Sequence, residues 1–171
     1  MSGVPDYQRF AERFLDLSSN QRDSDGGPSM FDSAAMPGLY DIQAGPGHIK
    51  CYMKVGKTHV NFMGNLHGGC TGSLVDLVGS AALATLGTTP HVSISITTNY
   101  LRPAPIGTII RIESSVIKPG ASVNTMIVHI YDDASNKMVA QGTHIKMMMH
   151  KQQMPGEYSA PKNEDTQTSR L

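Results

Sequence analysis

The chain has 171 residues, enough for one domain with a sizeable core. Hydrophobic residues make up 39% and charged residues 16%, which is typical of a globular protein and excludes a collagen or a chain disordered throughout. Equal numbers of acidic and basic residues give a formal net charge of zero, so overall charge does not favour nucleic acid or an anionic membrane surface as a partner.

The numbers and positions of particular residue types disfavour further classes of protein. Two cysteines, Cys51 and Cys70, are too few for a disulfide framework and fit a reducing compartment. The seven histidines are scattered along the chain, so we expect no metal and no separate cofactor. No secretory signal is evident, and the most apolar window, residues 73–86, is too short to span a bilayer.

Residues 1–36 are expected to form an N-terminal helix and a flexible linker. A Pro-Asp pair favours a helix start, and residues 18–33 are rich in Ser, Asp and Gly. The apolar positions at helical spacing are Tyr7, Phe10, Phe14 and Leu17.

The folded domain is expected to span residues 37–150. A run of small and apolar residues predicts an enclosed helix over 68–86 that ends before Gly87, with glycines inside it where another backbone comes close. Alternating apolar and polar residues predict strands whose one face meets the helix and whose other face meets water or a partner. These segments are 39–44, 48–55, 91–101, 108–117, 122–131 and 138–149. One long helix against an antiparallel sheet is an α+β arrangement.

Residues 151–171 have no periodicity and are expected to form a disordered tail. The tail ends in Ser169-Arg170-Leu171, a close variant of the Ser-Lys-Leu peroxisomal address. We therefore expect peroxisomal localisation through an import receptor. A chance match is the alternative, with the cytoplasm or a mitochondrion as the other locations.

The segment from Asn61 to Asp76 carries the chemistry. His67-Gly68-Gly69 stands at the start of the predicted helix, where exposed N–H groups and the helix dipole suit an anion or a developing oxyanion. A tight turn with a capping histidine explains the same residues. Asp76 follows about two turns later between apolar pairs, which predicts a buried carboxylate without a partner on its own helix. Such a carboxylate is a functional candidate. A surface charge on the helix, or one paired to another strand, is the alternative.

These residues together resemble the hotdog-fold thioesterase superfamily. The resemblance rests on Asn61, His67-Gly68-Gly69 and Asp76, and on two later runs, the Tyr100-Leu101-Arg102-Pro103-Ala104 and Ala140-Gln141-Gly142-Thr143-His144 segments. It covers roughly Leu39 to Lys146 and is nearest to the thioesterase superfamily member 2 and phenylacetic-acid-pathway types. It implies a hotdog fold, in which the antiparallel sheet wraps around one long central helix.

The resemblance also implies a role for each site residue. Gly68 would offer its N–H to the thioester carbonyl, and Asn61 would polarise that carbonyl or hold water. Asp76 would act across a dimer interface as general base, or as a nucleophile that forms an anhydride. Ser93 would help position the water or the carboxylate. His67 would have a structural hydrogen-bonding role rather than that of a general acid.

The coenzyme A arm would bind to residues of two matched loops and the helix start. These residues are Gly69, Tyr100, Leu101, Arg102, Pro103, Lys118 and Gly120. Arg102 and Lys118 would lie near its phosphates, although ordinary solvated charges are the alternative.

The resemblance therefore implies an acyl-CoA thioesterase that acts on fatty acyl-CoA as a homodimer at least, with a homotetramer expected. A hotdog hydratase or dehydratase and a non-catalytic acyl-CoA binding protein are the alternatives. No Gly-x-Ser-x-Gly sequence is present, which disfavours a serine-triad enzyme. The length of the acyl chain is not predicted.

Overall fold

The computed structural model describes residues 38–87 and 90–149, together with residues 7–9, 11, 12, 15 and 31. Its strands are β1 (Tyr40–Gly45), β2 (His48–Lys54), β3 (His91–Tyr100), β4 (Ile109–Lys118), β5 (Val123–Asp132) and β6 (Lys137–Met148). The helical elements that are described over their full length are the short 3₁₀ turn η1 (Lys57–His59) and the helix α3 (Gly68–Ala84). The predicted α+β fold is confirmed, and each predicted strand boundary differs from the observed one by at most one residue.

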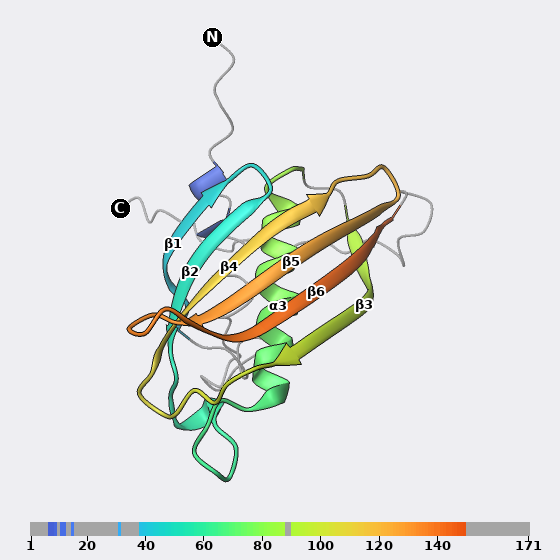
Figure 1. Ribbon diagram of the computed structural model, residues 1–171. Helices are drawn as coiled ribbons and strands as arrows, with labels where there is room; N and C mark the ends of the chain where they lie inside the picture. The colour runs from blue at the N-terminus through green and yellow to red at the C-terminus, as the bar shows by residue number, and fades with distance from the viewer. Residues whose placement is uncertain are drawn as a thin grey trace, which may run out of the picture.

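The six strands form one antiparallel sheet in the order β1-β2-β4-β5-β6-β3. The sheet and the helix form two layers: α3 lies against one face of the sheet, and the sheet curves around it (Figure 1). Pro46 and Gly47 connect β1 and β2 in a hairpin, with Gly47 at a positive φ of 68°. The chain therefore has the hotdog arrangement that its sequence resembles.

The core lies between α3 and the inward-facing side chains of the sheet. Leu74, Val75 and Val78 of the helix are fully buried. Alternate residues along the central strands meet them, because successive side chains of a strand point to opposite faces. The inward set is Ile49, Cys51, Met53, Ile110, Ile112, Met126, Val128 and Ile130.

Two glycines allow α3 to lie very close to β6. A Cβ added to Gly142 would lie 2.4 Å from a methyl carbon of Val75, and one added to Gly79 would lie 3.0 Å from Nδ1 of His144. A Cβ on Gly72 would meet nothing within 4 Å. The helix ends two residues before the predicted boundary, because Thr85 caps it and its Oγ1 donates to the carbonyl of Ala82 at 2.7 Å.

Within the described part of the chain, strand β3 lies at the edge of the sheet and pairs with β6 alone. Its register shifts between Ser93 and Ser95, which marks a bulge, and the alternation of the sequence is not matched by alternate burial. The side chains of Val92, Ile94 and Ile96 are 41%, 56% and 39% exposed. An edge strand with three exposed branched side chains is a ready surface for pairing with another chain.

The described N-terminal residues are helical and contact the opposite edge of the sheet. Ala11 and Leu15 are buried, and both were absent from the predicted apolar set. The Gln8 side chain donates to the carbonyl of Ile42 and accepts from the N–H of Ala44 at 2.9 Å. Gln8 therefore pairs with two backbone groups on the outer edge of β1. Apart from Phe31, the linker at 18–33 lies outside the described residues, as does the tail at 151–171 with its Ser-Arg-Leu ending.

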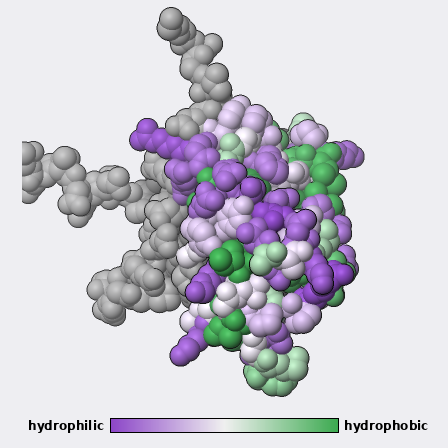
Figure 2. All heavy atoms as spheres, turned by 60° about the vertical axis from the view of Figure 1, so that its left-hand side comes forward, coloured by the Kyte–Doolittle hydropathy of each residue, from purple (hydrophilic) through white to green (hydrophobic). Residues whose placement is uncertain are grey.

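The surface on the β1–β2 side is mostly hydrophilic, with apolar side chains in small separate groups (Figure 2). Within the described part of the chain, no helix combines the length and apolar character needed to cross a membrane.

The close approach at Gly142 gives a direct test of the fold. Gly142→Ala should lower the free energy of unfolding by about 3 kcal/mol, because the added methyl group forces α3 and β6 apart. Denaturation in guanidinium chloride at one fixed protein concentration measures this change.

Gly45→Ala is the matched control, because a Cβ at that strand position meets nothing within 4 Å. Its stability should stay within about 1 kcal/mol of the unsubstituted protein. Equal stability of the two variants would contradict the close packing described at Gly142.

Candidate functional site

The N-terminus of α3 is capped by His67. Its Nδ1 accepts a hydrogen bond from the N–H of Gly69 at 2.9 Å, and its carbonyl accepts from Thr71 at 3.0 Å. The N–H of Gly68, the first residue of the helix, has no hydrogen-bond acceptor among the described residues. An unsatisfied N–H at the positive end of a helix dipole is suited to bind an anionic oxygen.

Asn61 organises the loop that leads into this helix. Its Oδ1 accepts from the N–H groups of Met63 at 3.0 Å and Asn65 at 3.2 Å. The loop is tied to the segment after β3, because the N–H of Leu66 donates to the carbonyl of Ala104 at 2.8 Å. The Nδ2 group of Asn61 makes no hydrogen bond to a described residue, so it is a second donor near the helix start.

A cavity of about 580 Å³ lies beside the helix start. It brings together seven of the residues expected in the site, namely Asn61, Gly68, Gly69, Tyr100, Leu101, Arg102 and Pro103. Tyr100 holds the two sides of it together, because its Oη donates to the carbonyl of Gly68 at 3.1 Å. Arg102 donates from Nη1 to the carbonyl of Met138 at 2.8 Å. The cavity has both polar donors and apolar walls, as expected of a ligand site.

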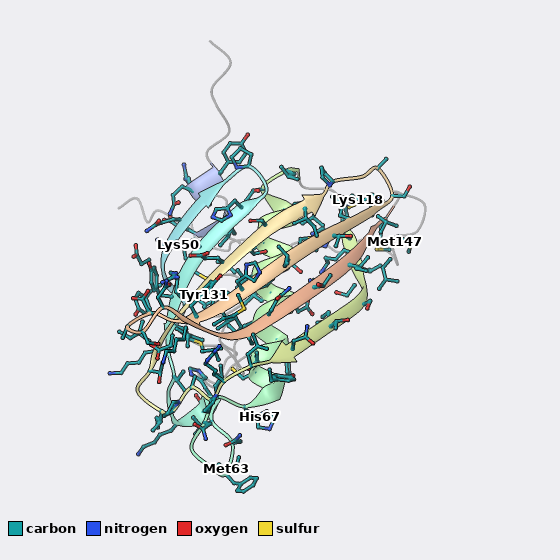
Figure 3. All side chains as sticks on the ribbon, viewed as in Figure 1. Lys50, Met63, His67, Lys118, Tyr131 and Met147 are labelled. Atoms are coloured by element: carbon teal, nitrogen blue, oxygen red, sulfur yellow. The ribbon has the colours of Figure 1, made fainter. Side chains whose placement is uncertain are left out.

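The other two expected coenzyme A residues lie elsewhere in the same chain. Lys118 ends β4 and pairs with Thr125, at the end of the sheet opposite His67 (Figure 3). Gly120 lines a separate cavity of about 370 Å³ beside the end of α3. A single chain therefore does not bring Lys118 or Gly120 to Arg102.

The apolar neighbours of Asp76 predicted that it would be buried, but it is not. Its carboxylate also has hydrogen-bond partners. Its side chain is 47% exposed, because it lies on the side of α3 toward the edge strand, where the sheet ends. Its Oδ1 accepts from Ser80 at 3.3 Å, which is on the same helix, and from Ser93 on β3 at 3.4 Å. The expectation of a buried carboxylate without a helix partner is wrong for the single chain.

Two residues of β6 complete this cluster, and sequence reasoning assigned a role to neither. Nε2 of His144 lies 2.9 Å from Oγ of Ser93 and 3.5 Å from Oδ1 of Asp76. Nζ of Lys146 lies 3.5 Å from the same carboxylate oxygen. The sequence signal was the run of alternate inward positions on β6, which changes from Ala140 and Gly142 to these two polar residues.

The contacts of Asp76 are all on one of its oxygens. Ser80, Ser93, His144 and Lys146 all approach Oδ1, and no described side chain hydrogen-bonds to Oδ2. One oxygen is thus held in place while the other can exchange a proton with a ligand or water. This is the arrangement that a positioned general base requires.

His144 is neutral in this environment. Its side chain is fully buried, and burial and then the nearby Lys146 ammonium lower the pKa of His144 to about 4, against the opposing effect of Asp76. Burial likewise lowers the pKa of His91, the neighbouring histidine at the start of β3. At neutral pH the imidazole of His144 therefore offers one donor and one acceptor, and no charge.

The two halves of the site are separated within one chain. Asp76 lies eight residues after Gly68 on the same helix, which corresponds to about 12 Å along its axis. Neither Asp76 nor Ser93 lines the cavity beside Gly68. Among residues 38–87 and 90–149, no three His, Cys, Asp or Glu side chains gather to hold a metal ion.

Comparisons with known proteins point to one family. The family model described as thioesterase superfamily matches residues 63–139. Acyl-coenzyme A thioesterase 13 of Homo sapiens is 39% identical over 106 residues, which are 61% of this chain and 76% of that protein.

Solved structures agree with that match. Zebra fish thioesterase superfamily member 2 has a TM-score of 0.75 at 29% identity, over 83% of this chain and 98% of the other. The phenylacetic acid degradation protein of Thermus thermophilus has a TM-score of 0.60 at 25% identity, over 66% and 94%. The chain therefore belongs to the thioesterase superfamily, among the hotdog-fold relatives of acyl-coenzyme A thioesterase 13 and thioesterase superfamily member 2.

Proposed function

We propose that this protein hydrolyses acyl-CoA thioesters to a free acid and coenzyme A, with fatty acyl-CoA as the substrate class. The observation that carries the proposal is the Gly68 N–H, which lacks an acceptor among the described residues and lies beside a cavity that also contains Asn61. The name of the human relative, an acyl-coenzyme A thioesterase, supports an acyl-CoA substrate.

The helix start would serve the electrophilic half of the reaction. The thioester oxygen would accept from Gly68 N–H and from Nδ2 of Asn61, and these donors would stabilise the oxyanion that forms when water attacks. Loss of one such donor typically costs about 3 kcal/mol of transition-state stabilisation. The pantetheine arm would run past Tyr100–Pro103, which line the same cavity.

Asp76 would serve the other half as general base. Its Oδ2 takes a proton from the attacking water while the water oxygen bonds to the thioester carbon. When the tetrahedral intermediate collapses, the C–S bond breaks and the sulfur of coenzyme A receives that proton. Because Oδ1 is held by Ser80 and Ser93, the carboxylate needs little reorganisation during the reaction.

A complete site requires two chains. Asp76 and Gly68 are about 12 Å apart along one helix, too far for a carboxylate to serve the carbonyl bound at Gly68. We propose that two copies pair along β3, so that Asp76 of one copy faces the cavity of the other. The exposed branched side chains of β3 support this interface. The same sharing would bring Lys118 of one copy toward the coenzyme A arm held by the other, and a tetramer would be a pair of such dimers.

The base is tested by Asp76→Asn. The amide cannot accept the proton of water, so kcat should fall by at least about 100-fold while the protein still binds a non-hydrolysable acyl-CoA analogue. Release of free thiol measures turnover, and calorimetry measures binding.

Asp133→Asn is the matched control, because Asp133 pairs with Arg111 away from the cluster, and it should retain the activity. Unchanged hydrolysis in Asp76→Asn would remove Asp76 as the base. Transfer of ¹⁸O from labelled water into Asp76 during a single turnover would assign it as a nucleophile instead.

The interface is tested by Ile94→Lys. A charge on the exposed β3 edge should convert the dimer to a monomer and abolish hydrolysis with it, because each site loses its second half. Sedimentation velocity and the thiol-release assay follow the two effects in one sample.

Ile117→Lys is the control, since Ile117 is exposed to a similar degree, 58% against 56%, but lies on β4. It should leave both the dimer and turnover in place. A monomeric Ile94→Lys protein with full activity would show that one chain holds the whole site.

A further inference from the structure

Lys146 is a buried lysine, so its ammonium group needs hydrogen-bond acceptors inside the protein. The residue is only 5% exposed, and burial of an ammonium group is costly unless acceptors surround it. It lies on the inward face of β6, opposite α3, next to the equally inward His144. Its long side chain brings Nζ to the boundary between the helix and the edge strand, where Ser80 and Ser93 lie.

The ammonium has three hydrogens, and oxygen acceptors of three described side chains lie within 3.5 Å of it. Nζ donates to Oγ of Ser80 at 2.6 Å, to Oγ of Ser93 at 3.2 Å and to Oδ1 of Asp76 at 3.5 Å. The shortest of these contacts is to a serine rather than to the carboxylate. The group therefore does more than form an ion pair with Asp76.

These contacts fix the direction of two hydroxyl groups. An ammonium can only donate, so the oxygens of Ser80 and Ser93 receive hydrogens from Lys146 and must direct their own hydrogens elsewhere. A carboxylate can only accept, and Oδ1 of Asp76 is within 3.3 Å of Ser80 and 3.4 Å of Ser93. Ser93 can donate there when His144 carries its hydrogen on Nε2 and donates to Ser93.

We propose that Lys146 is a positioning residue that turns the hydroxyl groups of Ser80 and Ser93 toward Oδ1 of Asp76 and so leaves Oδ2 for the attacking water. Lys146 touches neither water nor substrate in this scheme. It acts through the two serines. The inference rests on the proposed thioesterase activity, in which Asp76 is the base.

The first test compares Lys146→Met with Lys146→Gln. Methionine keeps the length of the side chain but donates nothing, so kcat should fall at least about tenfold while KM stays within about twofold. Glutamine lacks the charge but keeps an N–H donor, so its kcat should recover to at least about threefold above that of the methionine variant. Lys137→Met, on the same strand but at its exposed start, should match the unsubstituted protein.

A structural role alone would give a different result. If Lys146 only holds the fold, kcat per folded dimer should be unchanged in both variants, with fraction folded taken from thermal melting and sedimentation at the assay temperature. That result overturns the proposal, as does equal kcat in the methionine and glutamine variants. Should Lys146→Met fail to fold, the glutamine variant must still show a lower kcat at unchanged KM, or the proposal fails.

A second readout does not depend on activity. The Lys146 ammonium contributes to the low pKa of His144, so Lys146→Met should raise that pKa from about 4 toward its ordinary value of 6.5. NMR titration of the labelled histidines, assigned with His144→Gln, measures the shift, and Lys137→Met should not change it. An unmoved His144 pKa overturns the placement of Lys146. If His144 shifts but the unsubstituted protein hydrolyses no acyl-CoA, then the proposed function has failed while the placement stands.

Discussion

The close contact between α3 and β6 is the constraint on which the rest of the structure depends. Gly142 lets Val75 of the helix approach the strand, and Gly79 lets the ring of His144 approach the helix. With α3 held at this distance, the inward residues of β6 reach Asp76. Because Gly68 and Asp76 belong to this one helix, its rise sets the separation between the two chemical groups.

In the proposed dimer, that separation would explain why two chains are needed for one reaction. A helix start that binds an oxyanion and a carboxylate about 12 Å away cannot act on one carbonyl, whatever their side-chain conformations. A two-fold partner that pairs along β3 would supply the missing carboxylate to each cavity, and symmetry would form two identical sites. The exposed apolar side chains of β3 and the half-exposed side chain of Asp76 have the same explanation, because both would be covered by the second copy.

The sequence was sufficient to predict the local structure and much of the half of the site at the start of α3. Alternation located every strand to within a residue, and Asn61, Gly68 and Gly69 could be placed with Tyr100–Pro103 in one cavity. The partners of Asp76 could not be predicted, because they depend on long-range register. Ser93 meets Asp76 beside a bulge in β3, and Lys146 faces inward at a position where alternation alone predicts an apolar residue.

The central claim is that each active site takes its oxyanion donors from one chain and its base from another. The most direct measurement is the activity of a mixed dimer of Asn61→Ala and Asp76→Asn chains, purified through two different tags. Each parent should be nearly inactive, and the mixed dimer should recover about half of the unsubstituted activity, because one of its two sites is then intact. A mixed dimer as inactive as its parents would contradict a site shared between chains.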